Sequence, residues 1–258
     1  GEWFDFSDSK VLTAAVEKTR DLASEMKGYV PKFENAAKLK STLSTLPNLQ
    51  ATEEARNLAQ TYAAAKLKLT LCGALSIEIK GKLSAAIEAG EDVKGAAKTK
   101  TVTPAPKFSV TKFRGDHNDL YEKYCIKTPT VTETFKVLVE IPVRDALDND
   151  FLNQFENIEK AVAQVTDLAD AYLLNQAQLE LTRLESLAQW EFDLAEAELQ
   201  NLCGEHEGIE GICTWVRKAS FKSNFDTDTF ANENLELWLE YTLPRDAYTR
   251  LIVNKKKS

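Results

Sequence analysis

The sequence predicts a mainly α-helical protein, an elongated antiparallel bundle of long helices with a small antiparallel β-containing head. Two observations lead to this fold class. Glycine and proline are absent from Val143 to Leu202, and this stretch is rich in Leu, Ala, Glu and Gln, which favour helices. Stretches with alternating apolar and β-branched residues lie on either side of it and are typical of strands. We therefore expect one elongated domain that covers residues 1–258.

The longest predicted helix covers residues 148–202. Asp148 or Asn149 can cap its start, and Gly204 stands just past its end, where a left-handed residue often terminates a helix. Its apolar stripe changes phase in the second half, so this helix is expected to pack against more than one neighbour. About 50 residues that rise about 1.5 Å each would span on the order of 75 Å.

Two further helices, at residues 9–46 and 51–95, are expected to complete the bundle. They are separated by the turn-forming stretch "TLPNLQAT", and Thr52 has the properties of a helix start. The stretch "GYVP" at positions 28–31 predicts a kink or break in the first helix, because proline disrupts a helix interior. No internal repeat is evident by inspection.

The β-containing head is expected to consist of residues 104–143 and 204–254. In the first part "KFSVTKF" and "TVTETFKVLVEIPV" alternate in the manner of strands, and in the second part "GICTWVRKASF", "LELWLEYTLP" and "AYTRLIVNKK" do the same. The stretch "ANENLELWLEY" is equally compatible with a short helix.

Composition limits the classes of partner. The 40 acidic and 32 basic residues give a formal charge of −8, which argues against binding to nucleic acid. No window approaches the roughly 18 consecutive apolar residues that a membrane-spanning helix needs. The sequence therefore predicts no transmembrane segment in the chain as given. Since the first residue is Gly1 instead of Met, trimming of a signal peptide or anchor is compatible with this prediction.

The four cysteines are candidates for two disulfides. Cys203 and Cys213 bracket a glycine-rich loop and are expected to close it as a disulfide. A zinc site with His206 is less favoured, because this loop supplies only three ligands. Cys72 and Cys125 then remain to pair with each other, or Cys72 is a buried free thiol.

Chemical motifs are scarce. The chain contains two histidines and no common nucleotide-binding, hydrolase or metalloprotease signature. We therefore predict no catalytic residue, no cofactor and no metal site. Candidate interaction residues are Trp215, Trp238, and Arg114 with Asp116, which belong to an Arg-Gly-Asp tripeptide of the type that integrins bind in exposed loops. The acidic turn from Asp116 to Asp119 is interpreted as solvated and not as an ion site.

These features favour a non-enzymatic recognition module, the ectodomain of a surface or secreted protein that binds another protein through its head or its helical faces. The alternatives are an intracellular scaffold or assembly subunit and a helical pore-forming toxin component. In architecture alone, the plan resembles trypanosome surface-protein ectodomains and pore-forming toxins of the cytolysin A type. The apolar stretch "LCGALSIEI" is short for the membrane hairpin that such toxins insert. An extracellular or cell-surface location follows if the cysteines are oxidised, and a cytoplasmic one if they are free.

Overall fold

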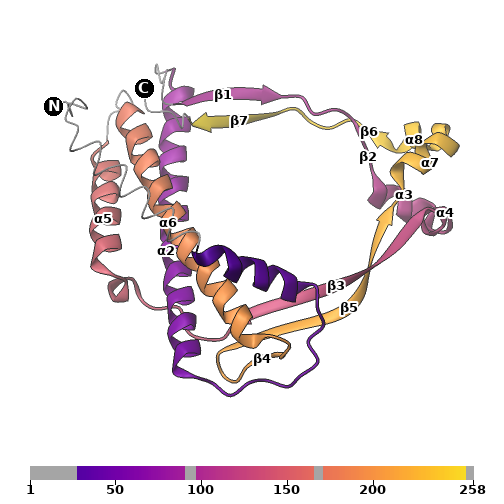
Figure 1. Cartoon of the computed structure of the whole chain (residues 1–258). Coiled ribbons are helices and arrows are strands. Elements are labelled where there is room, and N and C mark those ends of the chain that lie inside the picture. The colour runs from indigo at the N-terminus through magenta and orange to yellow at the C-terminus, as the bar shows by residue number, and fades with distance from the viewer. Residues whose placement is uncertain (1–27, 91–96, 166–170, 254–258) are drawn as a thin grey trace, which may run out of the picture. The chain divides into compact units, whose positions relative to one another are not determined.

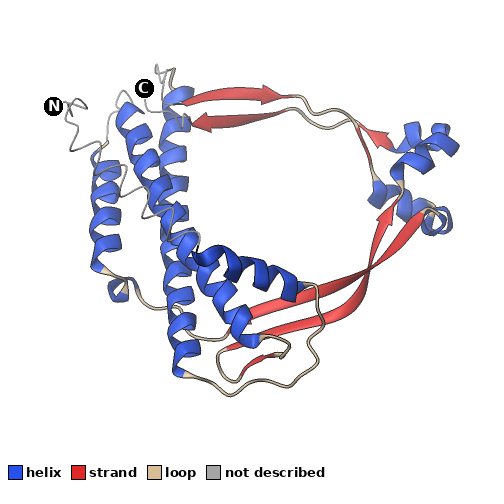
Figure 2. Cartoon of the chain, in the orientation of Figure 1, coloured by secondary structure: helices blue, strands red, loops and turns tan. Residues whose placement is uncertain are grey.

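The computed structural model describes residues 28–90, 97–165 and 171–253 (Figure 1). This part of the chain is mainly helical with small antiparallel sheets, as the sequence predicts (Figure 2). The chain divides into two compact units. The described part of unit 1 comprises residues 28–63, 133–140 and 190–218, and that of unit 2 comprises most of 64–132, 141–189 and 219–253.

Helical residues 28–40 precede the elements labelled in Figure 1. The labelled helices are α2 (Glu53–Glu88), α3 (Val110–Asp116), α4 (Asn118–Lys123), α5 (Asn149–Gln164), α6 (Ala171–Cys203), α7 (Thr227–Glu233) and α8 (Leu235–Tyr241), with a 3-10 turn at Arg144–Ala146. The strands are β1 (Ala97–Val102), β2 (Lys107–Phe108), β3 (Cys125–Val137), β4 (Gly208–Ile209), β5 (Cys213–Phe225), β6 (Thr242–Leu243) and β7 (Tyr248–Val253).

The helical core of unit 2 is formed by α2, α5 and α6. Each helix contributes a buried apolar stripe, which comprises Cys72, Leu75, Ile79 and Leu83 from α2, Phe151, Phe155, Ile158 and Val162 from α5, and Leu174, Ala177, Leu181 and Leu184 from α6. Of the two predicted caps, Asp148 is the one that caps α5, because its carboxylate accepts a hydrogen bond of 2.8 Å from the backbone N of Phe151.

The single helix predicted for residues 148–202 is wrong. α5 ends at Gln164, where Val165 has an extended backbone, with φ −76° and ψ 93°. A separate helix, α6, starts at Ala171. The sequence near this end contains Val162 and Val165, and β-branched side chains lose rotamer freedom in a helix. The predicted end is confirmed, since α6 stops at Cys203 and Gly204 follows with φ 55°.

The helices expected at 9–46 and 51–95 are shorter where the structure describes them. The first ends near residue 40, and its residues 9–27 lie outside the described range. α2 begins at Glu53, as predicted, and Thr52 caps it by accepting a 3.1 Å hydrogen bond from Ala55 N. α2 ends at Glu88, before Gly90, which has φ 83°.

The strands form three small sheets with the orders β1-β7, β2-β6 and β3-β5-β4. β1 and β7 are antiparallel, with Ala97 opposite Val253 and Val102 opposite Tyr248. The predicted strands in "TVTETFKVLVEIPV", "GICTWVRKASF" and "AYTRLIVNKK" correspond to β3, β5 and β7. The strands predicted in "KFSVTKF" and "LELWLEYTLP" are wrong, because most of these residues form α3 and α8. The short-helix alternative for "ANENLELWLEY" is confirmed.

Unit 1 has its own core, at the start of α2 and the end of α6. Its buried residues are Ala55, Ala59, Leu199, Cys203, Ile209, Ile212, Cys213 and Trp215. The loop that follows helical residues 28–40 runs parallel to the segment after α6, with bridges from Leu46 to His206 and from Leu49 to Ile209. Segments distant in sequence therefore enclose the loop between Cys203 and Cys213.

Candidate functional site: a duplicated four-helix cluster

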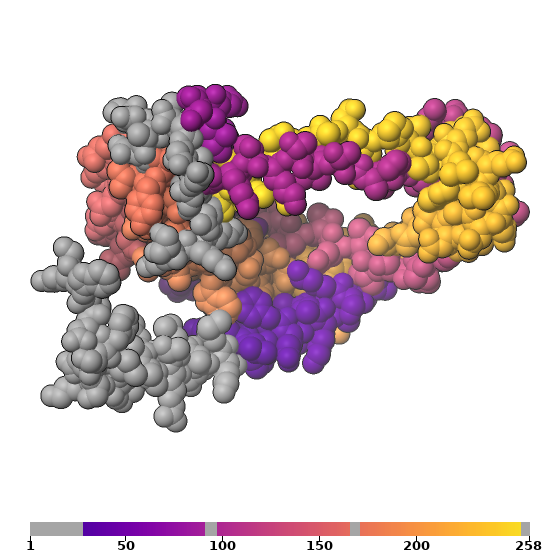
Figure 3. Space-filling model, turned by 90° about the horizontal axis from the view of Figure 1, so that it is seen from above, coloured from indigo at the N-terminus to yellow at the C-terminus, as the bar shows by residue number. Residues whose placement is uncertain are grey.

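Four short helices of unit 2 form a distinct cluster. Its first half, residues 108–126, contains α3 and α4, and its second half, residues 225–243, contains α7 and α8. The two halves pack against each other, as the magenta and yellow atoms in Figure 3 show. We call this assembly the four-helix cluster.

Each half of the four-helix cluster begins in the same way. Ser109 caps α3 by accepting a hydrogen bond from Lys112 N, and Asp226 caps α7 by accepting one from Thr229 N. The backbone N of Ser109 donates to Tyr241 O, and that of Asp226 donates to Tyr124 O, each at 2.9 Å. The start of each half is thus hydrogen-bonded to the end of the second helix in the other half.

The two halves also repeat in sequence. The aromatic pattern F-x4-F-x7-[Y/W]-x2-Y occurs in each, at a constant interval of 117 residues, the difference between positions 108 and 225. The equivalent pairs are Phe108 and Phe225, Phe113 and Phe230, Tyr121 and Trp238, and Tyr124 and Tyr241. This repeat was not evident by inspection because the intervening polar residues differ. The constant spacing of the aromatic residues was the signal that would have revealed it.

Equivalent aromatic residues of the two halves form equivalent stacked pairs. Phe108 stacks on Trp238, with ring centroids 4.4 Å apart and planes 5° apart. The equivalent residues, Phe225 and Tyr121, stack at 5.3 Å and 10°. Such stacked pairs add to the stabilisation that area burial provides. The two halves therefore exchange aromatic side chains reciprocally.

The centre of the four-helix cluster contains Phe113 and Phe230, both fully buried, with ring centroids 4.7 Å apart. Phe113 meets Tyr241 edge-to-face at 5.3 Å, and Phe230 meets Tyr124 in the same way at 5.2 Å. The contacts are thus related by an approximate two-fold axis that passes between the two phenylalanines.

The polar contacts at the edge of this core are repeated as well. The Tyr241 hydroxyl donates to Asp116 Oδ2 at 2.8 Å, and the Tyr124 hydroxyl donates to Glu233 Oε2 at 2.5 Å. Asp116 and Glu233 occupy equivalent positions. Burial, together with the Asp116 carboxylate, raises the pKa of Tyr241 to about 12. Buried hydroxyls therefore have charged acceptors in both halves.

The outer faces of the two halves differ. On α4, Asn118 and Glu122 are exposed polar residues one turn apart. The equivalent residues on α8 are Leu235 and Leu239, which are 59% and 62% exposed. Because both helices pack on the same aromatic core, the fold itself does not require leucine at these positions. Packing within this cluster therefore leaves the exposed leucine pair unexplained.

Charge differs between the halves too. Residues 109–126 contain three acidic residues and three lysine or arginine residues. The equivalent residues 226–243 contain no lysine or arginine and five acidic residues, which are Asp226, Asp228, Glu233, Glu236 and Glu240. The leucine face of α8 is therefore flanked by negative charge.

The Arg-Gly-Asp tripeptide lies at the end of α3 and not in a loop. The Arg114 guanidinium lies over the Tyr121 ring, 4.9 Å from its centroid, and Asp116 is the acceptor of Tyr241. Trp238 is half-buried. Three of the predicted interaction residues therefore belong to the four-helix cluster, where they also contribute to its packing.

Trp215, the fourth predicted interaction residue, is a core residue of unit 1 with 0% exposure. Its indole N donates to Glu133 at 3.0 Å. The Arg217 guanidinium lies 3.8 Å from the centre of the Trp215 ring. Complete burial makes Trp215 unsuitable as a surface contact, which corrects the prediction.

Arg217 is a buried cation that the sequence analysis missed. It is 1% exposed, and its guanidinium donates to Leu39 O at 2.8 Å and to Gly204 O at 2.5 Å. Burial lowers the pKa of Arg217. Since Gly204 follows the carboxyl end of α6, the guanidinium satisfies a helix-terminal carbonyl and is favoured by the helix dipole. Arg217 thus links the end of α6 to the end of helical residues 28–40.

The cysteines of the structure are free, so the predicted disulfides are not present. Cys203 and Cys213 are buried neighbours whose Sγ atoms are 3.6 Å apart. Cys72 and Cys125 are not paired, since Cys72 belongs to the helical core of unit 2 and Cys125 packs against the aromatic core of the four-helix cluster. Burial, together with Glu185, raises the pKa of the Cys72 thiol to about 12. The loop from Cys203 to Cys213 therefore brings one pair of thiols together, and the structure leaves the other pair apart.

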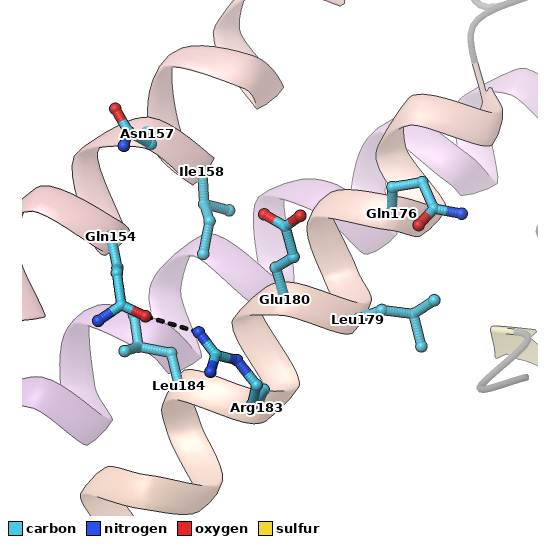
Figure 4. A pocket seen from close by; sticks show the side chains of 8 residues that line it. All are labelled: Gln154, Asn157, Ile158, Gln176, Leu179, Glu180, Arg183 and Leu184. Atoms are coloured by element: carbon cyan, nitrogen blue, oxygen red, sulfur yellow. Dashed lines mark hydrogen bonds between the residues drawn. The ribbon is translucent and has the colours of Figure 1, made fainter. Parts of the chain in front are cut away.

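A groove of about 470 Å³ lies between α5 and α6 in unit 2 (Figure 4). Its eight lining residues are Gln154, Asn157, Ile158, Gln176, Leu179, Glu180, Arg183 and Leu184. Arg183 bridges the groove by donating to Gln154 Oε1 at 2.7 Å. None of the eight is a cysteine, serine or histidine, so the groove offers no nucleophile of those types.

Among the residues that the structure describes, no cluster of His, Cys, Asp or Glu has a geometry that would hold a metal ion. Within the same ranges, no helix is sufficiently long and apolar to cross a membrane. Comparison of the chain with protein-family models, with curated proteins and with solved structures found no match. The argument for function therefore depends on the geometry of this chain.

Proposed function

We propose that this protein is a non-enzymatic recognition module that binds another protein through the four-helix cluster. One observation carries the proposal. Leu235 and Leu239 are more than half exposed on α8, whereas the equivalent positions of α4 are polar. Adjacent exposed apolar residues on a rigid helix are typical of protein-binding surfaces.

The support of α8 favours binding over a purely structural role. Trp238, on the flank next to Leu235, and Tyr241, on the side of the helix away from the leucines, anchor α8 through ring contacts with Phe108 and Phe113. A helix held in this way loses little conformational freedom when a partner binds, which favours affinity. The two leucines are therefore presented in a preorganised arrangement.

Site-specific photo-crosslinking tests this function. A photoreactive phenylalanine analogue replaces Leu239 in one variant and Glu122, the equivalent residue of α4, in a matched control. In the protein's native surroundings, position 239 should form a discrete protein adduct and position 122 should not. Adducts at neither position, or equally at both, would contradict recognition through this face.

An extracellular or cell-surface location belongs to the same proposal, in which the neighbouring thiols of Cys203 and Cys213, free in the structure, become oxidised to a disulfide. The 3.6 Å separation of their sulfur atoms supports this pairing, because a small approach brings them to the bonded distance of about 2.05 Å.

The elongated shape of the helical bundle is also still a prediction, which small-angle scattering would test.

Thiol labelling of natively purified protein tests the location. After denaturation without reductant, alkylation should modify Cys72 and Cys125 and leave Cys203 and Cys213 unmodified until a reductant is added. Mass spectrometry of the peptides identifies each site. Alkylation of all four without reductant would favour the alternative, an intracellular scaffold or assembly subunit.

A further inference from the structure

The outer face of α8 carries negative charge beside its two leucines, and this charge indicates the class of partner. We infer that this face binds a basic amphipathic segment of another protein, in which apolar side chains are flanked by lysine or arginine. The inference rests on the proposed recognition function and adds the chemistry of the partner to it.

The apolar part of the partner is indicated by the geometry of the leucines. Leu235 and Leu239 are separated by one helical turn, and their exposures are 59% and 62%. Residues at positions i and i+4 lie on one face of a helix, so the two side chains form one continuous apolar strip. A helix with apolar side chains at the same spacing is complementary to such a strip.

The charge of the partner is indicated by the residues beside the strip. Glu236 and Glu240 follow the two leucines directly and are exposed, and the segment 226–243 contains no basic residue. The equivalent positions of α4 are Asp119 and Lys123, which have opposite charges. A row of negative charge along one side of the apolar strip is thus specific to α8, and it attracts a positively charged partner.

A second copy of this chain is a poor occupant for the same reason. Two α8 faces in a symmetric dimer would place Glu236 and Glu240 of one copy near those of the other. Like charges across an interface oppose association. Charge therefore favours a different, basic protein over self-association.

Selection from a random peptide display library, with the whole chain as the target, tests the inference. Selected peptides should contain lysine or arginine beside apolar residues. The double variant L235N/L239E, which copies the polar residues of α4, should reduce their affinity at least about tenfold. The variant E236Q/E240Q should also weaken binding and reduce its dependence on salt. Circular dichroism should show that both variants stay folded.

The matched control is N118L/E122L, which gives α4 the leucine pair of α8 next to Asp119 and Lys123. Combined with L235N/L239E, this change should not restore binding of the basic peptides, because the flanking negative charge is absent. Restoration would show that apolar area alone determines binding and would overturn the charge argument.

Other outcomes separate this inference from the proposed function. Peptides that lack basic residues but bind L235N/L239E more weakly than the unaltered chain would refute the basic partner and leave the proposed recognition through α8 intact. Peptides that bind L235N/L239E as well as the unaltered chain would refute peptide binding at α8, and the proposed function would then be decided by photo-crosslinking at position 239. A dimer that dissociates in L235N/L239E would make the face a contact between copies and would refute the inference. Failure of both peptide selection and photo-crosslinking would count against both proposals.

Discussion

The two halves of the four-helix cluster have the same interior and different exteriors. Phe113 and Phe230 meet at the centre, and their neighbours are related by the same two-fold axis. On the outside, Asn118 and Glu122 of α4 correspond to Leu235 and Leu239 of α8. Residues that are alike in both halves are those that packing requires. Residues that differ, such as those on the outer faces of α4 and α8, are not required by packing.

The interior is alike because close packing tolerates few alternatives. A ring that fills the centre of a cluster contacts residues from both halves, so its loss leaves a cavity that neighbours cannot fill. The exterior contacts only solvent, where most residue types are tolerated. An exposed apolar pair in one half therefore has to be explained by something other than folding.

The largest expected effect concerns the central rings. Phe113→Ala and Phe230→Ala should each lower the free energy of unfolding by about 3–5 kcal/mol, since both side chains are fully buried. Urea denaturation followed by circular dichroism measures the change. Phe221→Ala is the control, because Phe221 is 68% exposed. Strongly unequal losses for the two central rings would break the equivalence of the halves.

A smaller effect is expected for the two tyrosine hydroxyls. Tyr124→Phe should cost about 1–2 kcal/mol, because its hydroxyl donates to Glu233 and also accepts a 2.9 Å hydrogen bond from Asn234 Nδ2. Tyr241→Phe removes the hydrogen bond to Asp116 and should cost less. The same denaturation assay measures both variants. A larger loss for Tyr241→Phe would show that these polar contacts are not equivalent.

The helix caps should differ in their dependence on pH. The Asp226 carboxylate accepts hydrogen bonds from the backbone N and the hydroxyl of Thr229, which lower its pKa. Its contribution to stability is therefore present above the ordinary pKa of Asp and is lost as the pH falls through the lowered folded-state value. Ser109, its counterpart, does not ionise in this range.

The variant D226S, which has the same capping residue as α3, tests this difference. Unfolding midpoints at about pH 6 and about pH 2 should fall less on acidification in D226S than in the unaltered chain. Other carboxylates contribute equally to both proteins. An identical acid sensitivity would indicate that the Asp226 cap does not stabilise the folded chain through its charge.

The smallest expected effect is that of exchanging the outer faces. L235N/L239E and N118L/E122L should each change the free energy of unfolding by less than about 1 kcal/mol, because the substituted side chains are exposed. Thermal and urea denaturation measure the change. A loss several times larger for L235N/L239E would mean that the leucines are packed within the chain and are not available to a partner.

The sequence analysis succeeded where a structural signal is local. Thr52 was identified as a helix start, Asp148 as one of two possible caps beside Asn149, and Gly204 as the residue after a helix end. It failed for "KFSVTKF" and "LELWLEYTLP", because a short apolar run fits a strand or a helix equally well. The choice of helix depends on contacts of Phe113 and Trp238 with rings more than a hundred positions away.

The sequence by itself determined the mainly helical character of this protein, its caps, its negative charge and the spacing of its aromatic residues, since these follow from composition and from interactions within a few residues. The tertiary structure decided which of those residues are buried. Only the packed chain shows that Trp215 and Arg217 are interior, that Cys203 and Cys213 are neighbours, and that the aromatic repeats form one cluster. Burial depends on which distant segments meet, and exposure of Leu235 and Leu239 becomes informative only when the faces of the two halves can be compared.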